Sequence, residues 1–174
     1  MKSLALSTRT AKEILRDPIN LGFGLGFPII LLLLLSAIQA NVPVSVFEIA
    51  SLAPGIAVFG LSFMTLFSAS LLSRDRESAL LQRLYTAPLS AADFICGYAL
   101  PMLPIALMQS LVCYIAAVAL GLPLTPRIAL AVLLMLPAML LFIALGLLFG
   151  SVLGIKQVGG ICGALLTNLT AWFS

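Results

Sequence analysis

The sequence predicts an all-α fold: a bundle of helices that crosses a lipid bilayer several times. Hydrophobic residues make up 62% of the chain and charged residues only 9%, whereas a soluble globular domain carries about 25% charged residues. The mean hydropathy of +1.21 leaves too little polar surface to coat a soluble protein. The charges are also clustered, because Glu48 is the only charged residue between Pro18 and Leu72.

Five segments are apolar enough to span a membrane, given that a spanning helix needs about 20 residues. We predict helices rather than barrel strands, because runs such as residues 31–35 do not alternate polar and apolar side chains. The whole chain, residues 1–174, forms one transmembrane domain in this interpretation. The predicted spans are residues 19–40, 52–72, 94–120, 128–153 and 158–174.

The distribution of basic residues predicts the orientation of the bundle. Arg127 alone falls on one side, and the other eight lysines and arginines fall on the opposite side, in residues 2–16, in residues 74–83 and at Lys156. Because basic residues accumulate in cytoplasmic loops, the N-terminus and the loop between the second and third spans should be cytoplasmic.

The first 17 residues predict an interfacial elbow helix. Leu4, Ala11, Ile14 and Leu15 fall on one helical face, Leu6 is an exception, and the opposite face carries the charged residues. Asp17-Pro18 should end this helix, because a residue before proline is disfavoured in the helical region. An alternative is that these are the basic residues that commonly flank the cytoplasmic end of a membrane span. The charged residues of the elbow are Arg9, Lys12, Glu13, Arg16 and Asp17.

The segment 73–93 is longer than a simple loop and predicts a short amphipathic helix ending before Pro88. Such a helix is suited to docking a cytoplasmic protein, although it could instead lie among lipid headgroups. Ser90 is a candidate N-cap for the following helix, with Asp93 in its first turn.

Several functional classes are disfavoured by what the sequence lacks. It has no histidine, and its three cysteines have no metal-ligand spacing, so we expect no metal site and no cofactor. It has no P-loop, so the chain should not bind ATP in that way, and we expect it not to be an enzyme. The net charge of +3 reflects membrane topology, and nothing in the sequence indicates nucleic acid.

The predicted spans contain polar and small residues but no charged ones within their cores. A buried amide should face protein or a cavity, and this makes Ser62, Thr65, Gln109 and Ser110 candidates for a substrate path or for interhelical hydrogen bonds. Glycines four residues apart favour close helix packing. Four prolines, Pro28, Pro101, Pro104 and Pro137, should kink their spans. The glycine ridges are Gly146, Gly150, Gly154, Gly159 and Gly163.

Residues 75–90, DRESALLQRLYTAPLS, resemble the E-R-E-x-G-T-L-E-x-L-x-x-T-P-[LV]-S run of ABC type-2 exporter permeases. Residues 12–18, KEILRDP, resemble the N-terminal elbow motif of that family, and residues 146–169 resemble its fourth and fifth spans. The chain departs from the family pattern at Ser78-Ala79, where members often have Gly-Thr. It also ends near the fifth span, whereas such permeases usually have six, so we expect a chain truncated before the sixth span.

The resemblance implies the membrane permease subunit of an ATP-driven exporter in the bacterial inner membrane. Its implied partners are a separate ABC ATPase subunit, a second permease copy (the same or a different chain) and the lipid bilayer. The implied cargo is an amphiphilic or apolar compound such as a drug, a lipid or a glycan-lipid. The resemblance therefore also implies a role in multidrug efflux. The alternative is an ATP-independent membrane scaffold or assembly factor. The residues to which the resemblance gives the ATPase-coupling role are Glu77, Ser78, Leu80, Leu81, Arg83, Leu84, Tyr85 and Thr86.

Overall fold

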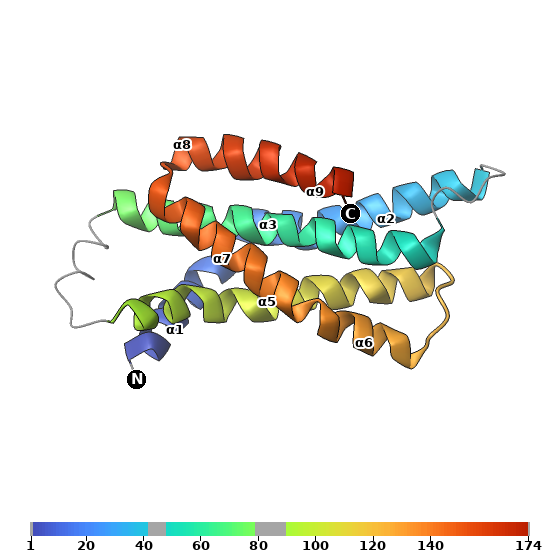
Figure 1. The fold of residues 1–174 in the computed structure, drawn as a ribbon, viewed down its shortest axis with the longest axis horizontal. Coiled ribbons are helices and arrows are strands. Elements are labelled where there is room, and N and C mark those ends of the chain that lie inside the picture. The colour runs from blue at the N-terminus through green and yellow to red at the C-terminus, as the bar shows by residue number, and fades with distance from the viewer. Residues whose placement is uncertain (1, 42–47, 79–89, 174) are drawn as a thin grey trace.

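The computed structural model describes residues 2–41, 48–78 and 90–173. These residues fold into an elongated bundle of helices without strands, which confirms the all-α prediction (Figure 1). The helices, in chain order, are α1 (Lys2–Leu15), α2 (Pro18–Asn41), α3 (Ile49–Glu77), α5 (Ala91–Ala119), α6 (Pro126–Leu134), α7 (Leu136–Val152), α8 (Ile155–Val158), the π-helix η1 (Gly159–Leu166) and α9 (Thr167–Phe173).

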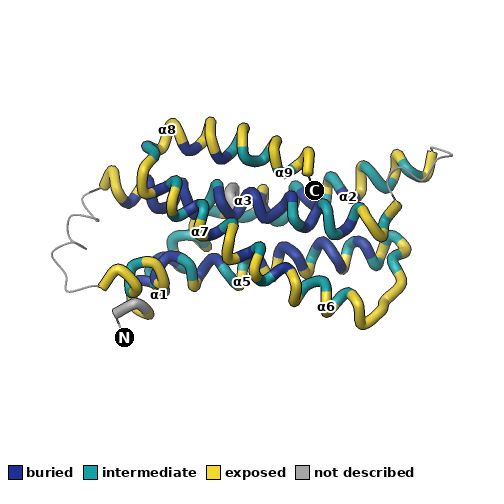
Figure 2. The backbone as a smooth tube through the Cα atoms, viewed as in Figure 1, coloured by how far each residue is buried: buried dark blue, intermediate teal, exposed yellow. Residues whose placement is uncertain are grey.

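Helix α3 lies at the centre of the bundle. It packs against α2, α5, α7 and η1, and Figure 2 shows its buried surface continuing along its length. In its most apolar stretch 72% of the residues are buried, compared with 17% in α2. The exposed apolar residues of the outer helices are therefore the surface that lipid would cover.

Four helical stretches among the described residues are long and apolar enough to cross a membrane: Leu21–Asn41, Ile49–Glu77, Ala91–Ala119 and Pro126–Val152. The segment predicted as the fifth span is helical from α8 through α9, but its hydrogen bonding changes to the π type in η1. The chain is therefore a multi-pass membrane protein.

Two local predictions are confirmed at helix ends. Ser90 and Asp93 form a reciprocal capping box at the start of α5, in which Ser90 Oγ accepts from the Asp93 N–H at 3.1 Å. The fourth span breaks at Met135, immediately before Leu136-Pro137, and divides into α6 and α7. Proline explains the break, because it has no N–H to donate and its ring displaces the preceding turn. The other prolines with a predicted kink lie inside helices that continue without a break, Pro28 in α2 and Pro101 and Pro104 in α5.

Helix α1 differs from the expected picture of a helix that only lies on the membrane. It packs against α5, and Leu6, the exception in the amphipathic pattern, is only 7% exposed. Its side chain occupies the space that a Cβ would take at Gly97, the nearest Leu6 atom lying 2.5 Å from that position. Leu6 therefore anchors the elbow to the bundle, whereas Leu4 and Leu15 remain exposed.

Candidate functional site

The last turn of α3 carries four consecutive charged residues, Arg74, Asp75, Arg76 and Glu77, which we call the charged end of α3. The predicted second span ended at Leu72, but the helix continues to Glu77 and ends where the Ser78 N–H donates to the Arg74 carbonyl at 3.1 Å. Arginine and glutamate are good helix formers, and arginine near a helix C-terminus complements the helix dipole. The four side chains therefore project from a regular helix into neighbouring elements.

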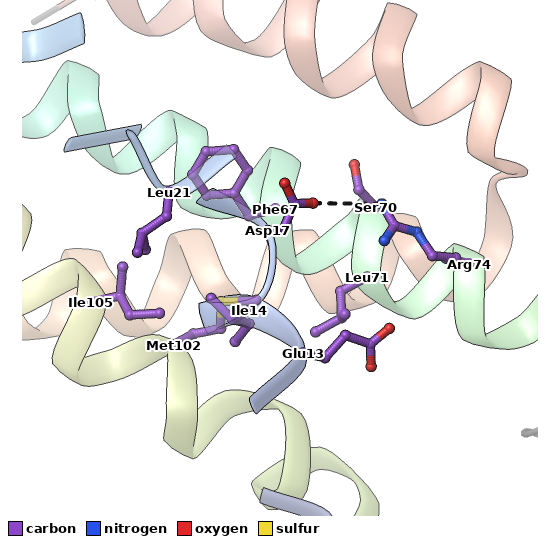
Figure 3. Close-up of a pocket in the computed structure, with 10 residues that line it drawn as sticks. All are labelled: Glu13, Ile14, Asp17, Leu21, Phe67, Ser70, Leu71, Arg74, Met102 and Ile105. Atoms are coloured by element: carbon purple, nitrogen blue, oxygen red, sulfur yellow. Dashed lines mark ion pairs between the residues drawn. The ribbon is translucent and has the colours of Figure 1, made fainter. Parts of the chain in front are cut away.

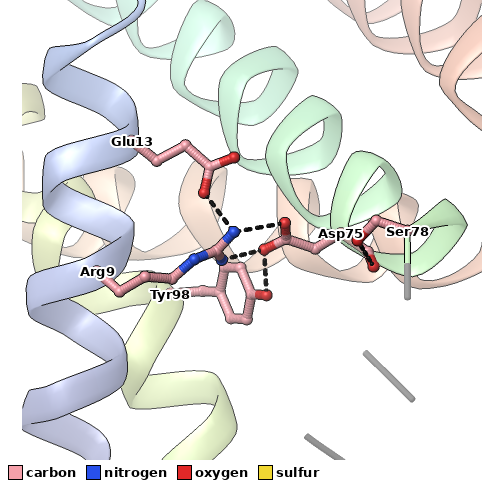
Figure 4. A network of polar contacts seen from close by, with 5 residues as sticks. All are labelled: Arg9, Glu13, Asp75, Ser78 and Tyr98. Atoms are coloured by element: carbon pink, nitrogen blue, oxygen red, sulfur yellow. Dashed lines mark hydrogen bonds and ion pairs between the residues drawn. The ribbon is translucent and has the colours of Figure 1, made fainter. Parts of the chain in front are cut away.

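Asp75 is the centre of a buried polar network (Figure 4). It is only 3% exposed, and its two carboxylate oxygens accept from the Arg9 guanidinium at 2.5 and 3.0 Å. The Tyr98 hydroxyl donates to Asp75 Oδ2 at 2.6 Å. A carboxylate this buried is tolerated only when it is fully partnered, and here a bidentate arginine and a phenol satisfy it. The network joins α1, α3 and α5.

Glu13 is the outer member of this network. Its Oε2 lies 2.6 Å from Arg9 Nη2, yet burial raises the pKa of the Glu13 carboxyl, and the negative charge of Asp75 adds to that effect. The pKa of Arg9 is raised principally by its hydrogen bond to Asp75. Asp75 is therefore the main counter-charge of Arg9.

Arg76 and Glu77 hold the turn between α7 and α8. Arg76 Nη1 donates to the carbonyls of Gly150 and Leu153, at 3.0 and 3.3 Å. Glu77 Oε1 accepts from the Ile155 N–H at 2.9 Å. Because helix C-termini present unpaired carbonyls and helix N-termini unpaired N–H groups, the two opposite charges match the two helix ends. We call this pair of contacts the α7–α8 clasp.

Arg74, the first residue of the charged end of α3, faces the elbow. Its Nη2 lies 3.9 Å from Asp17 Oδ2, in the turn between α1 and α2. The charged end of α3 thus contacts the elbow turn, α1, α5 and the α7–α8 turn through consecutive residues.

The predicted elbow residues divide into two sets. Arg9, Glu13 and Asp17 face the charged end of α3, whereas Lys12 and Arg16 are exposed. Of the predicted coupling residues, Glu77 and Ser78 are described, and Ser78 Oγ donates to the Asp75 carbonyl at 2.8 Å. The remainder lie outside the described residues: Leu80, Leu81, Arg83, Leu84, Tyr85 and Thr86.

The polar residues of the spans are buried between helices. Gln109 Nε2 donates to the Ala57 carbonyl at 3.4 Å, over Gly60, where a Cβ would collide with the amide. Thr65 Oγ1 donates to the Phe142 carbonyl at 2.7 Å and so links α3 to α7. Ser62 Oγ donates within its own helix, and Ser110 is fully buried. A substrate path through these residues would need α3, α5 and α7 to separate, and it stays a prediction.

The predicted glycine ridges have unequal surroundings. A Cβ at Gly146 would lie 2.6 Å from the Thr65 carbonyl oxygen, and one at Gly150 would lie 2.7 Å from the Ala69 carbonyl oxygen. These two glycines let α7 approach α3 closely. A Cβ at Gly154 would lie 3.3 Å from Glu77 Oε1, and one at Gly163 would lie 3.6 Å from the Leu66 side chain. Apart from its chain neighbours and the backbone of its own helix, no atom among the described residues lies within 4 Å of a Cβ built at Gly159.

The sequence interpretation missed Asp75, Arg76 and Tyr98 as structural partners. Asp75 sits between two arginines and looked like part of an exposed loop. A signal was nevertheless present, because Asp75 follows the buried Leu71 and Leu72 by four and three residues and so continues their helical face.

A family model described as "ABC-2 type transporter" matches residues 2–174. Comparisons with curated proteins and with solved structures returned no match. The family match extends over nearly the whole chain and agrees with the multi-pass helical bundle. The chain therefore belongs to the ABC-2 type transporter family and is a transmembrane component of such a transporter.

Proposed function

We propose that this chain is the permease subunit of an ATP-driven exporter that moves an amphiphilic or apolar compound out of the cytoplasm. A separate ABC ATPase subunit hydrolyses the ATP, and a second permease copy completes the transporter. The N-terminus, the charged end of α3 and the α7–α8 turn face the cytoplasm of the cell that carries the protein, which we take to be bacterial. A drug, a lipid or a glycan-lipid fits the absence of charged residues from the span cores.

The observation that carries this proposal is the position of the charged end of α3. It immediately precedes residues 79–89, where the sequence predicts an ATPase-docking helix, and it contacts the elbow, α5 and the α7–α8 turn. A force applied by the ATPase to the docking segment would therefore reach several spans through short polar contacts. Glu77 already accepts from Ile155, so an ion pair between Glu77 and the ATPase would use its second carboxylate oxygen.

Substitution of Leu84 tests the docking part of the proposal. Leu84→Asp places a charge on the predicted apolar ridge, so the ATPase should no longer co-purify with the chain, while membrane insertion is retained. The same variant should lose ATP-dependent accumulation of cargo in inside-out vesicles. Leu124→Asp is the matched control, because Leu124 is 84% exposed in the turn before α6, at the other end of the bundle.

Two outcomes would contradict the proposal. If Leu84→Asp retains the ATPase as well as Leu124→Asp does, docking takes place elsewhere. If the wild-type chain binds a cytoplasmic protein that has no ATPase activity, and vesicles show no ATP-dependent accumulation, the scaffold alternative is correct.

A further inference from the structure

Helix α1 exposes large apolar side chains on the face that points away from the bundle. Leu6 and Thr10 are buried on the opposite face, whereas Leu4 is 62% exposed and Leu15 is 67% exposed. These two leucines are separated by about three helical turns, so they lie along one edge of the helix. No function assigned above uses this apolar edge.

A basic edge lies beside the two leucines. Lys12 is exposed and follows Leu15 by about 60° around the helix axis. Arg16 is also exposed, and its N–H still donates to the Lys12 carbonyl at 3.2 Å, which keeps it on the course of the helix. The exposed Thr8 lies between the two edges. We call the surface formed by Leu4, Thr8, Lys12, Leu15 and Arg16 the outer face of α1.

The two cations of the outer face are not neutralised by acidic neighbours. Among the described residues Lys12 and Arg16 have no ion-pair partner, although three acidic side chains lie nearby. Those three face other arginines, and the four basic residues together outnumber them by one. An anion is therefore the favoured partner of this face. The existing pairs are Asp75 and Glu13 with Arg9, and Asp17 with Arg74 (Figure 3).

The apolar edge indicates which kind of anion this is. A small soluble anion would use only Lys12 and Arg16 and would leave the two leucines in water. An anionic phospholipid carries its phosphate directly above its acyl chains, and the outer face places basic beside apolar side chains in the same way. Helix α1 also ends just before Pro18, where the first span begins, so this face lies at the level of the headgroups.

We propose that the outer face of α1 binds an anionic phospholipid of the inner leaflet. The phosphate lies between Lys12 and Arg16, and Leu4 and Leu15 contact the upper part of the acyl chains. The opposite face of the same helix holds the bundle through Leu6 and Arg9, so lipid and protein fix α1 from two sides. Only the choice of leaflet rests on the orientation in the proposed function.

Quenching of a tryptophan by brominated lipids tests this inference in vesicles whose two leaflets have the same composition, equal parts of phosphatidylglycerol and phosphatidylcholine. In the variant Thr8→Trp, Trp172→Phe, the only tryptophan lies on the outer face of α1. Bromine on phosphatidylglycerol should quench it at least about fivefold more than bromine on phosphatidylcholine, because each basic residue near an anionic surface favours such lipid about fivefold. The unaltered chain, whose Trp172 is 86% exposed in α9, is the control and should show a ratio near one.

Glutamine substitutions separate a lipid site from a general effect of positive charge. Lys12→Gln should lower the quenching ratio at residue 8 at least about twofold, and the double variant Lys12→Gln, Arg16→Gln should bring it close to one. Lys156→Gln removes one exposed basic residue from α8, at the same end of the bundle (Figure 1). It should leave the ratio unchanged.

The inference is overturned if both lipids quench the tryptophan at residue 8 equally, or if Lys156→Gln lowers the ratio as much as Lys12→Gln does. Loss of the ratio on adding inorganic phosphate at constant ionic strength would show instead that the basic edge binds a soluble anion. Loss of the ratio on adding the ATPase would assign the face to a protein partner. Because these measurements need neither ATP nor cargo, their failure leaves the proposed function standing.

Discussion

At the scale of single residues, Asp75 joins the charged end of α3 to α1 and α5. Its carboxylate is almost completely buried and accepts hydrogen bonds from both Arg9 and Tyr98. Removing a charge from such a group leaves the opposite charge without its main partner, and that loss exceeds the value of an exposed ion pair.

Asp75→Asn should lower the free energy of unfolding by about 1–3 kcal/mol, because the amide keeps the shape of the side chain but loses its charge. Tyr98→Phe removes a single hydrogen bond and should cost about 0.5–1.5 kcal/mol. Glu48→Gln alters an exposed residue, and its effect should stay within about 0.5 kcal/mol. Unfolding in detergent measures all three, and equal stability of Asp75→Asn and Glu48→Gln would refute the role given to Asp75.

Residue-level prediction from the sequence succeeded where the signal is local. The Ser90–Asp93 capping box depends on residues three apart in the chain, and the structure contains it. The partners of Asp75 are 66 and 23 residues away, so no short pattern could identify them without the tertiary fold.

At the scale of elements, the closest helix packing is between α3 and α7. Gly146 and Gly150 face the backbone of α3 at distances that leave no room for a side chain. The four-residue spacing of glycines predicted a ridge of small residues. Which of these glycines are in close contact depends on whether a neighbouring helix lies opposite them. This is why Gly159 and Gly146, which look alike in sequence, differ in their surroundings.

Alanine substitutions separate these two kinds of glycine. Gly146→Ala and Gly150→Ala should each destabilise the bundle by about 1–3 kcal/mol, because the added methyl group forces α7 away from α3. Gly22→Ala introduces a methyl group into open space on α2 and should be neutral or stabilising by up to about 1 kcal/mol through helix propensity. Thermal unfolding of the three variants checks the order, and a Gly22 variant as unstable as the other two would contradict it.

At the scale of the whole molecule, composition and charge placement were sufficient to predict a multi-pass helical bundle, because lipid imposes long apolar helices. They could not predict that α3 is central, since hydropathy does not distinguish a helix surrounded by protein from one facing lipid. The orientation of the bundle stays a prediction from the positions of its basic residues.

Cysteine labelling in intact cells tests that orientation. A cysteine introduced at Ser45 should react with a membrane-impermeant reagent from outside, and one at Ser78 should react only after the cells are opened. Both residues lie beside the ends of α3 in the sequence, so they serve as controls for each other. The reverse labelling pattern would overturn the assignment of the charged end of α3 to the cytoplasm.

The central claim is that the charged end of α3 passes the motion of the ATPase to the α7–α8 turn through the clasp. Hydrogen exchange in the assembled transporter, containing a hydrolysis-deficient ATPase, measures this without knowledge of the cargo.

In wild type, ATP binding should change exchange of the amides of residues 153–158 by at least about twofold, because the clasp holds the start of α8. The double variant Arg76→Gln, Glu77→Gln should still bind the ATPase but lose that change. An ATP-dependent change of equal size in both proteins, or no change in wild type, would contradict the account.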